Sequence, residues 1–307
     1  MADAVAAIDC GSNSTRTLIV GGDGDVLVRE MNITRLSQGV DASGSLLPEA
    51  MERTFRVLRH YREACDAAGV TKGLLVATSA VRDAANGSVF LGAAHDIVGF
   101  DARILRGDEE AAYSYAGATD DLEPVATPTM IVDIGGGSTE LAAELDGVLV
   151  SYSMQLGCVR VTERALGRGV VTAASDVATR SMIEQELDRA FAAAPSLHDV
   201  VANVRLVGLA GTVATLAQLD AHVTTYDREA IHHRVLSRSS VQYWRDLLAS
   251  EPPDERLKHP GMILGREDVL PAGLYVLDAV MERFDVDRLL SSENDILDGI
   301  TTSLVHS

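Results

Sequence analysis

Short apolar runs alternate with longer segments of helical periodicity along this chain. The run Val5 to Asp9 is followed by a polar turn, a second apolar run from Thr17 to Val20, and a glycine-rich turn before Val26 to Glu30. This order predicts a strand–turn–strand unit whose last strand returns along the second. Apolar residues at helical spacing from Pro48 to Ala68 predict a helix, and Pro48 suits its first turn.

The rest of the chain continues to alternate strands and helices, which predicts an α/β fold. Further strands are predicted at residues 74–77, 102–105, 130–133, 140–144, 148–152, 205–209 and 288–290. Further helices are predicted at residues 86–95, 108–118, 175–194, 215–219, 239–249, 268–284 and 294–305. Asp108 is the predicted N-cap of its helix, and residues 252–266 are predicted to form a loop.

The opening pattern recurs about 124 residues later. Both copies consist of a strand ending in Asp, one variable residue, Gly, a polar turn and a second strand, at residues 9–16 and 133–140. An internal repeat of this length predicts two similar domains. The predicted boundary lies in residues 120–128, which contain two prolines, and it divides the chain into domains at 1–122 and 123–293.

The net charge of −19 on 307 residues restricts the possible partners. A strongly acidic chain repels nucleic acid. No apolar run reaches the ~18 residues that span a bilayer, and the acidic start at residues 1–3 lacks the basic region of a signal peptide, so we expect a cytoplasmic protein without membrane contact. Because only Lys72 and Lys258 are lysines, phosphate would be held by arginines, backbone N–H groups, helix N-termini or a metal.

The cysteines and the paired histidines predict no metal or disulfide chemistry. Cys10, Cys65 and Cys158 are odd in number and far apart, so we expect small buried side chains rather than a disulfide or a zinc site. His232 and His233 lack the spacing of helical metal ligands and are interpreted as structural.

The first copy of the repeat carries candidate metal and phosphate ligands. Asp9 lies at a strand end, where it can meet a metal-bound water, and Gly11 allows a sharp turn. The candidate phosphate ligands in this turn are Ser12, Asn13, Ser14 and Arg16. The alternative is an ordinary polar hairpin turn.

The second copy combines three consecutive glycines, which leave the backbone N–H groups accessible, with two carboxylates. The candidate phosphate ligands are Gly135, Gly136, Gly137 and Ser138. Asp133 and Glu140 flank the same turn, an arrangement that suits Mg²⁺ bound by one or two side chains, waters and phosphate oxygens. The alternative is a flexible glycine hairpin.

Four other residues are candidate site residues, each because of one feature of the sequence. Gly211 and Thr212 form a turn between a strand and a helix. The N-terminus of this helix can bind an anion, and the alternative is that the small residues allow tight packing of the strand and the helix. Arg82 follows a buried strand and faces the expected crevice of the sheet, with a surface ion pair as the alternative. Glu110 lies in a first helical turn, where acidic residues commonly complement the dipole, but it also shortly precedes the second copy.

Seven segments, in order and across nearly the whole chain, resemble the exopolyphosphatase and guanosine pentaphosphate phosphohydrolase (Ppx/GppA) family. They are residues 11–14, 77–82, 107–111, 133–140, 156–163, 210–214 and 266–273. The resemblance implies two actin-like (ribonuclease H-like) domains with an active-site cleft between them, and a final helix, 294–307, that rejoins the first domain. It also implies a homodimer and a short form that lacks the C-terminal helical domain of longer members.

The resemblance further implies roles for individual residues. Glu110 falls at the position of the general base. Asp133 and Glu140 fall at the acidic positions that the family links to its metal. Glu140 is also a candidate catalytic residue. Asp9, at its strand end, is a third candidate metal ligand. Mg²⁺ is the expected metal, with Mn²⁺ able to replace it. The positions implied to bind phosphate are Ser12, Asn13, Arg82 and Gly135 to Ser138.

The expected reaction is attack of water on the terminal phosphoryl group of inorganic polyphosphate. Guanosine pentaphosphate is the alternative substrate, and an actin-like ATP-dependent kinase or a non-catalytic polyphosphate sensor are alternatives of other classes. Leu297 stands where the family usually has an arginine. Together with the acidic surface, this departure predicts a preference for short polyphosphates, which Leu297→Arg would relax.

Overall fold

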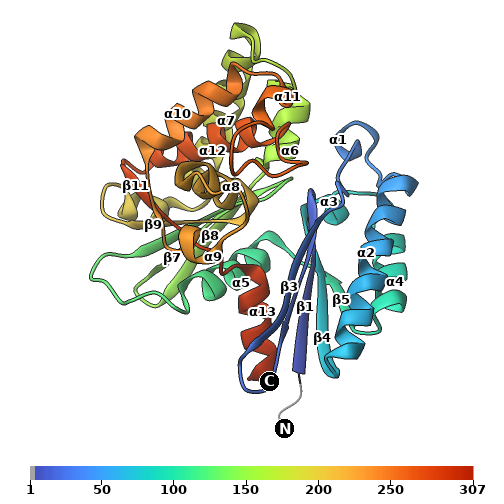
Figure 1. Ribbon diagram of the computed structural model, residues 1–307. Coiled ribbons are helices and arrows are strands. Elements are labelled where there is room, and N and C mark those ends of the chain that lie inside the picture. The colour runs from blue at the N-terminus through green and yellow to red at the C-terminus, as the bar shows by residue number, and fades with distance from the viewer. Residues whose placement is uncertain (1–3, 307) are drawn as a thin grey trace. The chain divides into compact units, whose positions relative to one another are not determined.

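The computed structural model describes residues 4–306, and the chain divides into two compact units (Figure 1). Unit 1 comprises Met1–Asp120 and Asn294–Ser307, and unit 2 comprises Asp121–Glu293. None of the helices in residues 4–306 combines the length and hydropathy of a membrane-spanning segment.

Unit 1 is built on a five-stranded mixed sheet. Its strands are β1 (Ala4–Cys10), β2 (Ser14–Val20), β3 (Val26–Ile33), β4 (Val70–Ala77) and β5 (Asp101–Ile104), in the order β3-β2-β1-β4-β5. The hairpin β1–β2 and the pair β2–β3 are antiparallel, whereas β1–β4 and β4–β5 are parallel. Every residue of β1 is buried, because β1 lies in the middle of the sheet and helices cover both of its faces.

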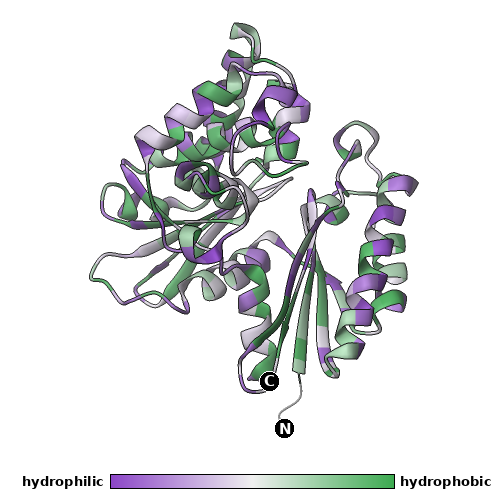
Figure 2. Cartoon of the chain, in the orientation of Figure 1, coloured by the Kyte–Doolittle hydropathy of each residue, from purple (hydrophilic) through white to green (hydrophobic). Residues whose placement is uncertain are grey.

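Two pairs of helices cover the sheet of unit 1. Helices α2 (Pro48–Ala67) and α4 (Gly87–Val98) pack on one face, and α5 (Gly107–Thr119) and α13 (Ile296–Val305) lie on the other (Figure 1). Helix α2 carries alternating hydrophilic and hydrophobic bands, as expected for a helix with one face on the core (Figure 2). The short helices of this unit are α1 (Val40–Ser43) and α3 (Ser79–Arg82).

Glycines allow α13 to pack closely against α5. A Cβ atom at Gly117 would collide with the carbonyl oxygen of Asp295, and one at Gly299 would collide with the carbonyl oxygen of Tyr113. The C-terminal helix is therefore a fixed part of unit 1, and it brings residues 295–298 to the hairpin β1–β2.

The sheet of unit 2 repeats that of unit 1. Its strands are β6 (Thr129–Ile134), β7 (Thr139–Leu145), β8 (Val148–Met154), β9 (Arg205–Leu209), β10 (Val235–Ser237) and β11 (Arg288–Ser291). The order β8-β7-β6-β9-β11 has the same sequence of strand directions as the sheet of unit 1, with β10 added antiparallel at the edge. The predicted repeat and the α/β class are confirmed.

Unit 2 has a larger core, formed mainly by the long helices. These are α7 (Ala173–Ala193), α8 (Ala210–Ala221), α10 (Arg238–Ala249) and α12 (Leu270–Arg283). The shorter helical segments are α6 (Cys158–Val161), η1 (Thr162–Leu166), η2 (Pro195–Val200), α9 (Arg228–Ile231) and α11 (Pro253–Arg256). Helix α12 is buried along most of its length, as its apolar sequence predicts.

Two details of the predicted elements are wrong. Helix α5 begins at Gly107 with Arg106 as its N-cap, so Asp108 lies inside the first turn. The Arg106 backbone N–H donates to Glu109 Oε2 at 2.9 Å, so the carboxylate of the third helical residue closes this end. The predicted loop 252–266 contains α11, where Pro253 occupies the favoured first position.

Candidate active site

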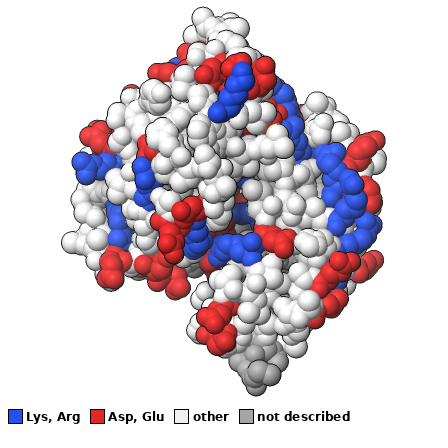
Figure 3. All heavy atoms as spheres, in the orientation of Figure 1, with Lys and Arg blue, Asp and Glu red and all other residues white. Residues whose placement is uncertain are grey.

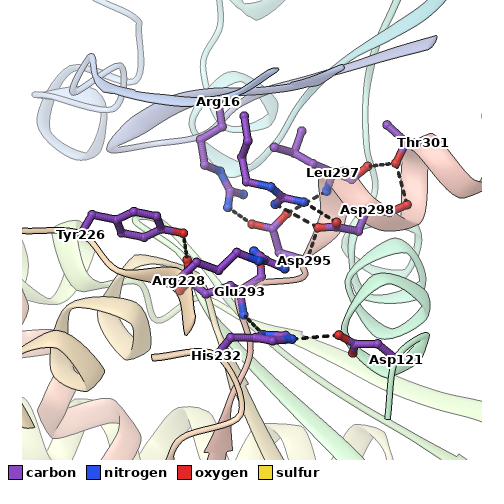
Figure 4. Close-up of polar contacts among 11 residues, drawn as sticks. Arg16, Asp121, Tyr226, Arg228, His232, Glu293, Asp295, Leu297, Asp298 and Thr301 are labelled. Atoms are coloured by element: carbon purple, nitrogen blue, oxygen red, sulfur yellow. Dashed lines mark hydrogen bonds and ion pairs between the residues drawn. The ribbon is translucent and has the colours of Figure 1, made fainter. Parts of the chain in front are cut away.

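The first Asp–x–Gly hairpin places Asp9 opposite Arg16. The two residues are Cα partners in the antiparallel pair β1–β2, and Arg16 Nη2 lies 2.6 Å from Asp9 Oδ2. The other end of the Arg16 guanidinium donates to the carboxylate of Asp295, at the start of α13 (Figure 4). Arg16 therefore bridges two carboxylates in unit 1, a contact that the sequence did not predict.

The Asp9 carboxylate is only partly satisfied. Its side chain is buried, and Oδ1 has no hydrogen-bond partner among the described residues. Burial raises the pKa of Asp9, and the adjacent Arg16 guanidinium opposes this rise. A buried carboxylate oxygen without a donor fits a bound cation, so the candidate role of Asp9 as a metal ligand is chemically reasonable.

The turn after β1 offers buried donors. Asn13 Nδ2 is buried and has no acceptor among the described residues, and the Ser12 hydroxyl lies 3.0 Å from that of Ser79. Ser14 begins β2, and its backbone carbonyl accepts from Gly11 N–H at 3.0 Å. An unused amide donor at the strand end suits an anion such as phosphate, the predicted role of this turn.

Arg82 and Glu110 meet in unit 1. Arg82 Nη1 lies 3.2 Å from Glu110 Oε2 and donates to the Leu105 carbonyl at 2.8 Å. Glu110 is 8 % exposed, so a carboxylate in the first turn of α5 is held inside the unit rather than on its surface. Its burial argues against a role limited to complementing the helix dipole, and its side chain is a candidate to accept a proton.

The second hairpin places two carboxylates opposite each other. Asp133 and Glu140 are Cα partners in the pair β6–β7, and both side chains are buried. Glu140 Oε1 accepts from the Ser153 hydroxyl at 2.6 Å. Like charges directly opposite on neighbouring strands are unfavourable, so this pair favours a cation beside it. A hard oxygen donor set of this kind fits Mg²⁺.

The backbone carbonyls of the glycine turn in the second hairpin accept hydrogen bonds from residues 158–160. Gly135 O accepts from Cys158 N–H at 2.9 Å, and Gly136 O accepts from Val159 N–H at 2.9 Å. Arg160 Nε donates to Gly137 O at 2.6 Å. These contacts fix the conformation of the turn. Two other residues that shape it are Ser138, whose carbonyl accepts from Gly135 N–H at 3.0 Å, and Gly157, where a Cβ atom would collide with the turn.

The turn at Gly211 and Thr212 is tightly packed. A Cβ atom at Gly211 would overlap the guanidinium of Arg266, and a Cβ atom at Gly273 would lie 2.5 Å from the Thr212 hydroxyl oxygen. These contacts support the packing alternative that the sequence left open. A role of the two residues in binding phosphate stays a prediction.

Comparison with known proteins places this geometry in a family. The profile of the Ppx/GppA phosphatase family matches residues 19–307. The chain belongs to the Ppx/GppA phosphatase family. Exopolyphosphatase 2 of Mycobacterium tuberculosis is 38% identical to it over 319 residues, which cover 98% of each chain.

Solved structures of Ppx/GppA proteins have the same fold. A crystal structure of an exopolyphosphatase-like protein matches with a TM-score of 0.92 and 30% identity over 99% of each chain. A Ppx/GppA family member from Aquifex aeolicus matches with a TM-score of 0.80 and 29% identity, over 99% of this chain and 98% of the other.

In this Ppx/GppA phosphatase, Leu297 does not face a substrate. Its side chain is 2 % exposed and belongs to a core cluster with Leu18, Val76 and Ile300. The expectation that an arginine here would serve long polyphosphates is wrong, because Leu297→Arg would place a charge inside the packed core of unit 1.

His232 links the two ends of unit 2, as Figure 4 shows. His232 Nδ1 accepts from the Glu293 backbone N–H at 3.0 Å, and its Nε2 lies 2.8 Å from Asp121 Oδ2. His233 stacks on it with ring centroids 3.8 Å apart. Asp121, His232 and His233 lie close enough to hold a metal ion. However, an accepting Nδ1 requires the proton on Nε2, which therefore cannot coordinate a metal, so the structural interpretation is favoured.

Proposed function

We propose that this Ppx/GppA phosphatase is a Mg²⁺-dependent exopolyphosphatase that releases orthophosphate from the end of inorganic polyphosphate. The relationship to Exopolyphosphatase 2, at 38% identity over 98% of both chains, supports the substrate class. The observation that carries the chemistry is the partly buried pair of Glu110 and Arg82, 3.2 Å apart, because it combines a proton acceptor with a cation that suits phosphate.

Glu110 is the proposed general base. Its carboxylate would orient a water molecule and accept its proton as the water attacks the terminal phosphorus atom. Arg82 holds Glu110 in place and supplies positive charge for the phosphoryl oxygens. Positioning of the water and neutralisation of charge on the phosphoryl oxygens account for most of what such a reaction requires of the protein.

Phosphate groups would be held by the two hairpins. The proposed ligands of unit 1 are Ser12, Asn13, Ser14, Arg16 and Arg82, and those of unit 2 are Gly135, Gly136, Gly137, Ser138, Gly211 and Thr212. In unit 2, Asp133 and Glu140 are the proposed ligands of Mg²⁺ or Mn²⁺, which would neutralise charge on the phosphate oxygens. In unit 1, Asp9 is a further candidate metal ligand. We further propose a cytoplasmic homodimer with a preference for short polyphosphates.

Parallel measurement of phosphate release tests the proposal. Inorganic polyphosphate, guanosine pentaphosphate and ATP should be supplied separately, each with Mg²⁺ and with EDTA. We expect the highest kcat/KM with polyphosphate and no turnover in EDTA. A higher kcat/KM with guanosine pentaphosphate would overturn the substrate, and full activity in EDTA would overturn the metal.

A further inference from the structure

Arg56 is an unusual cation in this acidic chain. The sequence has 26 lysines and arginines, and within residues 4–306 only the side chains of Arg56 and Arg288 have no hydrogen bond, ion pair or ring contact. Both side chains are exposed. A chain with 45 acidic residues offers a carboxylate to most of its cations, so an unpaired arginine has its full charge available for a ligand.

Arg56 lines a cavity of about 350 Å³ in unit 1, here called the α2 cavity. One wall is the end of β3 (Asn32 to Thr34), and the other is formed by Arg53, Arg56 and His60 of α2. Spacings of three and four residues place these three side chains along one face of the helix. None of the acidic residues within the described range 4–306 lines the cavity, and the neighbouring Glu30 pairs with His60 at 2.9 Å.

The α2 cavity adjoins the candidate phosphate-binding turn. Arg53 Nε donates to the Thr34 carbonyl at 3.0 Å, and Arg53 Nη2 donates to Gln38 Oε1 at 3.0 Å. The Thr34 backbone N–H in turn donates to the carbonyl of Asn13 at 3.0 Å. One layer of hydrogen bonds therefore connects the cavity wall to the turn that carries Ser12 and Asn13.

Local charge, rather than the net charge, decides what such a cavity attracts. Charges further away than the Debye length, about 8–10 Å in physiological salt, are largely screened. Figure 3 shows basic side chains gathered over α2, with acidic side chains at the margins of this group. Guanidinium groups bind phosphate with two parallel hydrogen bonds, so phosphate is the ligand chemistry that fits best.

We propose that the α2 cavity binds a phosphate group of a polyphosphate chain beyond the groups held at the Ser12–Ser14 turn, with Arg56 as the residue that determines chain-length preference. This proposal rests on the proposed function. Because the chain carries a net charge of −19, affinity should rise only until a short chain reaches the cavity, and longer chains should be repelled by the acidic surface beyond it.

Direct binding tests this inference without turnover. Polyphosphates of several defined lengths, together with orthophosphate, are titrated calorimetrically in EDTA into the wild type, Arg56→Glu and two charge-matched controls. Arg59→Glu lies on the same helix, but Arg59 pairs with Glu52 at 3.0 Å and does not line the cavity. Arg288→Glu changes the other unpaired cation, in unit 2. The length dependence of kcat/KM is then measured with Mg²⁺.

The expected result is specific to Arg56 and to chain length. Arg56→Glu should weaken binding of the longer chains by about tenfold and flatten the rise of affinity with length, whereas both controls should stay within about twofold of the wild type. Because Arg56 is exposed and its side chain is unpaired, its replacement should leave the urea midpoint of unfolding unchanged, so misfolding cannot mimic the effect.

Two outcomes would count against phosphate-chain binding in the α2 cavity, and a third would distinguish its failure from the failure of the proposed exopolyphosphatase function. Equal binding by Arg56→Glu and Arg59→Glu at every length would overturn it. An effect on orthophosphate alone would overturn the chain-length assignment and identify free phosphate as the ligand. Length-dependent binding by a wild type that hydrolyses no polyphosphate would support the cavity but refute the proposed function.

Discussion

The two Asp–x–Gly hairpins have the same topology and differ in one cross-strand partner. Asp9, on β1, faces Arg16 on β2, and the two form an ion pair. Asp133, at the equivalent place on β6, faces Glu140 on β7. The first hairpin therefore neutralises its aspartate within the protein, whereas the second places two carboxylates side by side.

We expect this difference to give the two repeats different chemistry. A balanced carboxylate beside buried amide and hydroxyl donors suits an anion, and a pair of carboxylates suits a divalent cation. The residue that faces the aspartate, Arg16 in one hairpin and Glu140 in the other, is therefore where we expect the two turns to differ most in their affinity for a metal ion.

The largest effect is expected outside both hairpins, at Glu110. If the hairpins only hold phosphate and metal, Glu110→Gln should lower kcat by ~10²–10⁴ while substrate affinity changes little, because the general base is lost. Steady-state kinetics and binding measured on the same preparation check this. Glu109→Gln, one position earlier on α5, is the matched control and should retain activity. Wild-type turnover in Glu110→Gln would mean that a hairpin carboxylate removes the proton instead.

The second effect concerns stability and is expected only at the first hairpin. Arg16→Gln removes the cation that Asp9 and Asp295 share, so we expect the free energy of unfolding to fall by about 2–3 kcal/mol. Arg59→Gln, which breaks an exposed ion pair, should change it by less than about 0.5 kcal/mol. Urea unfolding in EDTA measures both. Equal stability of the two variants would show that Arg16 does not balance Asp9.

The third effect concerns metal binding and is expected mainly at the second hairpin. Glu140→Gln should weaken Mn²⁺ binding by at least about tenfold, because one of two hard oxygen ligands loses its charge. Glu144→Gln changes an exposed residue of the same strand and should bind Mn²⁺ like the wild type. Electron paramagnetic resonance of Mn²⁺ reports the affinity independently of turnover. A larger loss in Asp9→Asn than in Glu140→Gln would reverse the assignment of the hairpins.

The smallest effect concerns pH and lies in neither hairpin. Burial lowers the pKa of His232 below its usual 6.5, and the positive charges of His233 and Arg228 act in the same direction against the opposing Asp121. His232 therefore binds a proton more readily in the unfolded chain than in the folded chain. The free energy of unfolding should fall as the pH drops from 6.5 to the lower pKa of His232 in the folded protein.

Thermal unfolding across this pH range, with and without His232→Asn, isolates the histidine contribution. The variant should lose part of the pH dependence, since Asn can still accept from the Glu293 N–H but does not titrate. If the melting temperature of His232→Asn depends on pH as steeply as that of the wild type, the acid sensitivity belongs to carboxylates, including those of the hairpins.

Most elements of the fold could be predicted from the sequence because their signals are local. The strand at Arg205–Leu209 was predicted with the bounds observed for β9, and both hairpins follow from an apolar run that ends in Asp–x–Gly. By contrast, β10 has three residues and pairs only with β11, so too few positions alternate to reveal it.

The sequence by itself determined the repeat, the strand–turn–strand units and the residue types at each turn, because neighbours within a hairpin are neighbours in the chain. Only the tertiary structure decided which distant groups meet. Arg16 contacts Asp295 because α13 returns to unit 1, and Leu297 is buried because the same helix turns that position to the core. Helix α2 likewise places Arg53 and Arg56 opposite β3. Such contacts depend on how helices pack onto a sheet, and no local pattern encodes that packing.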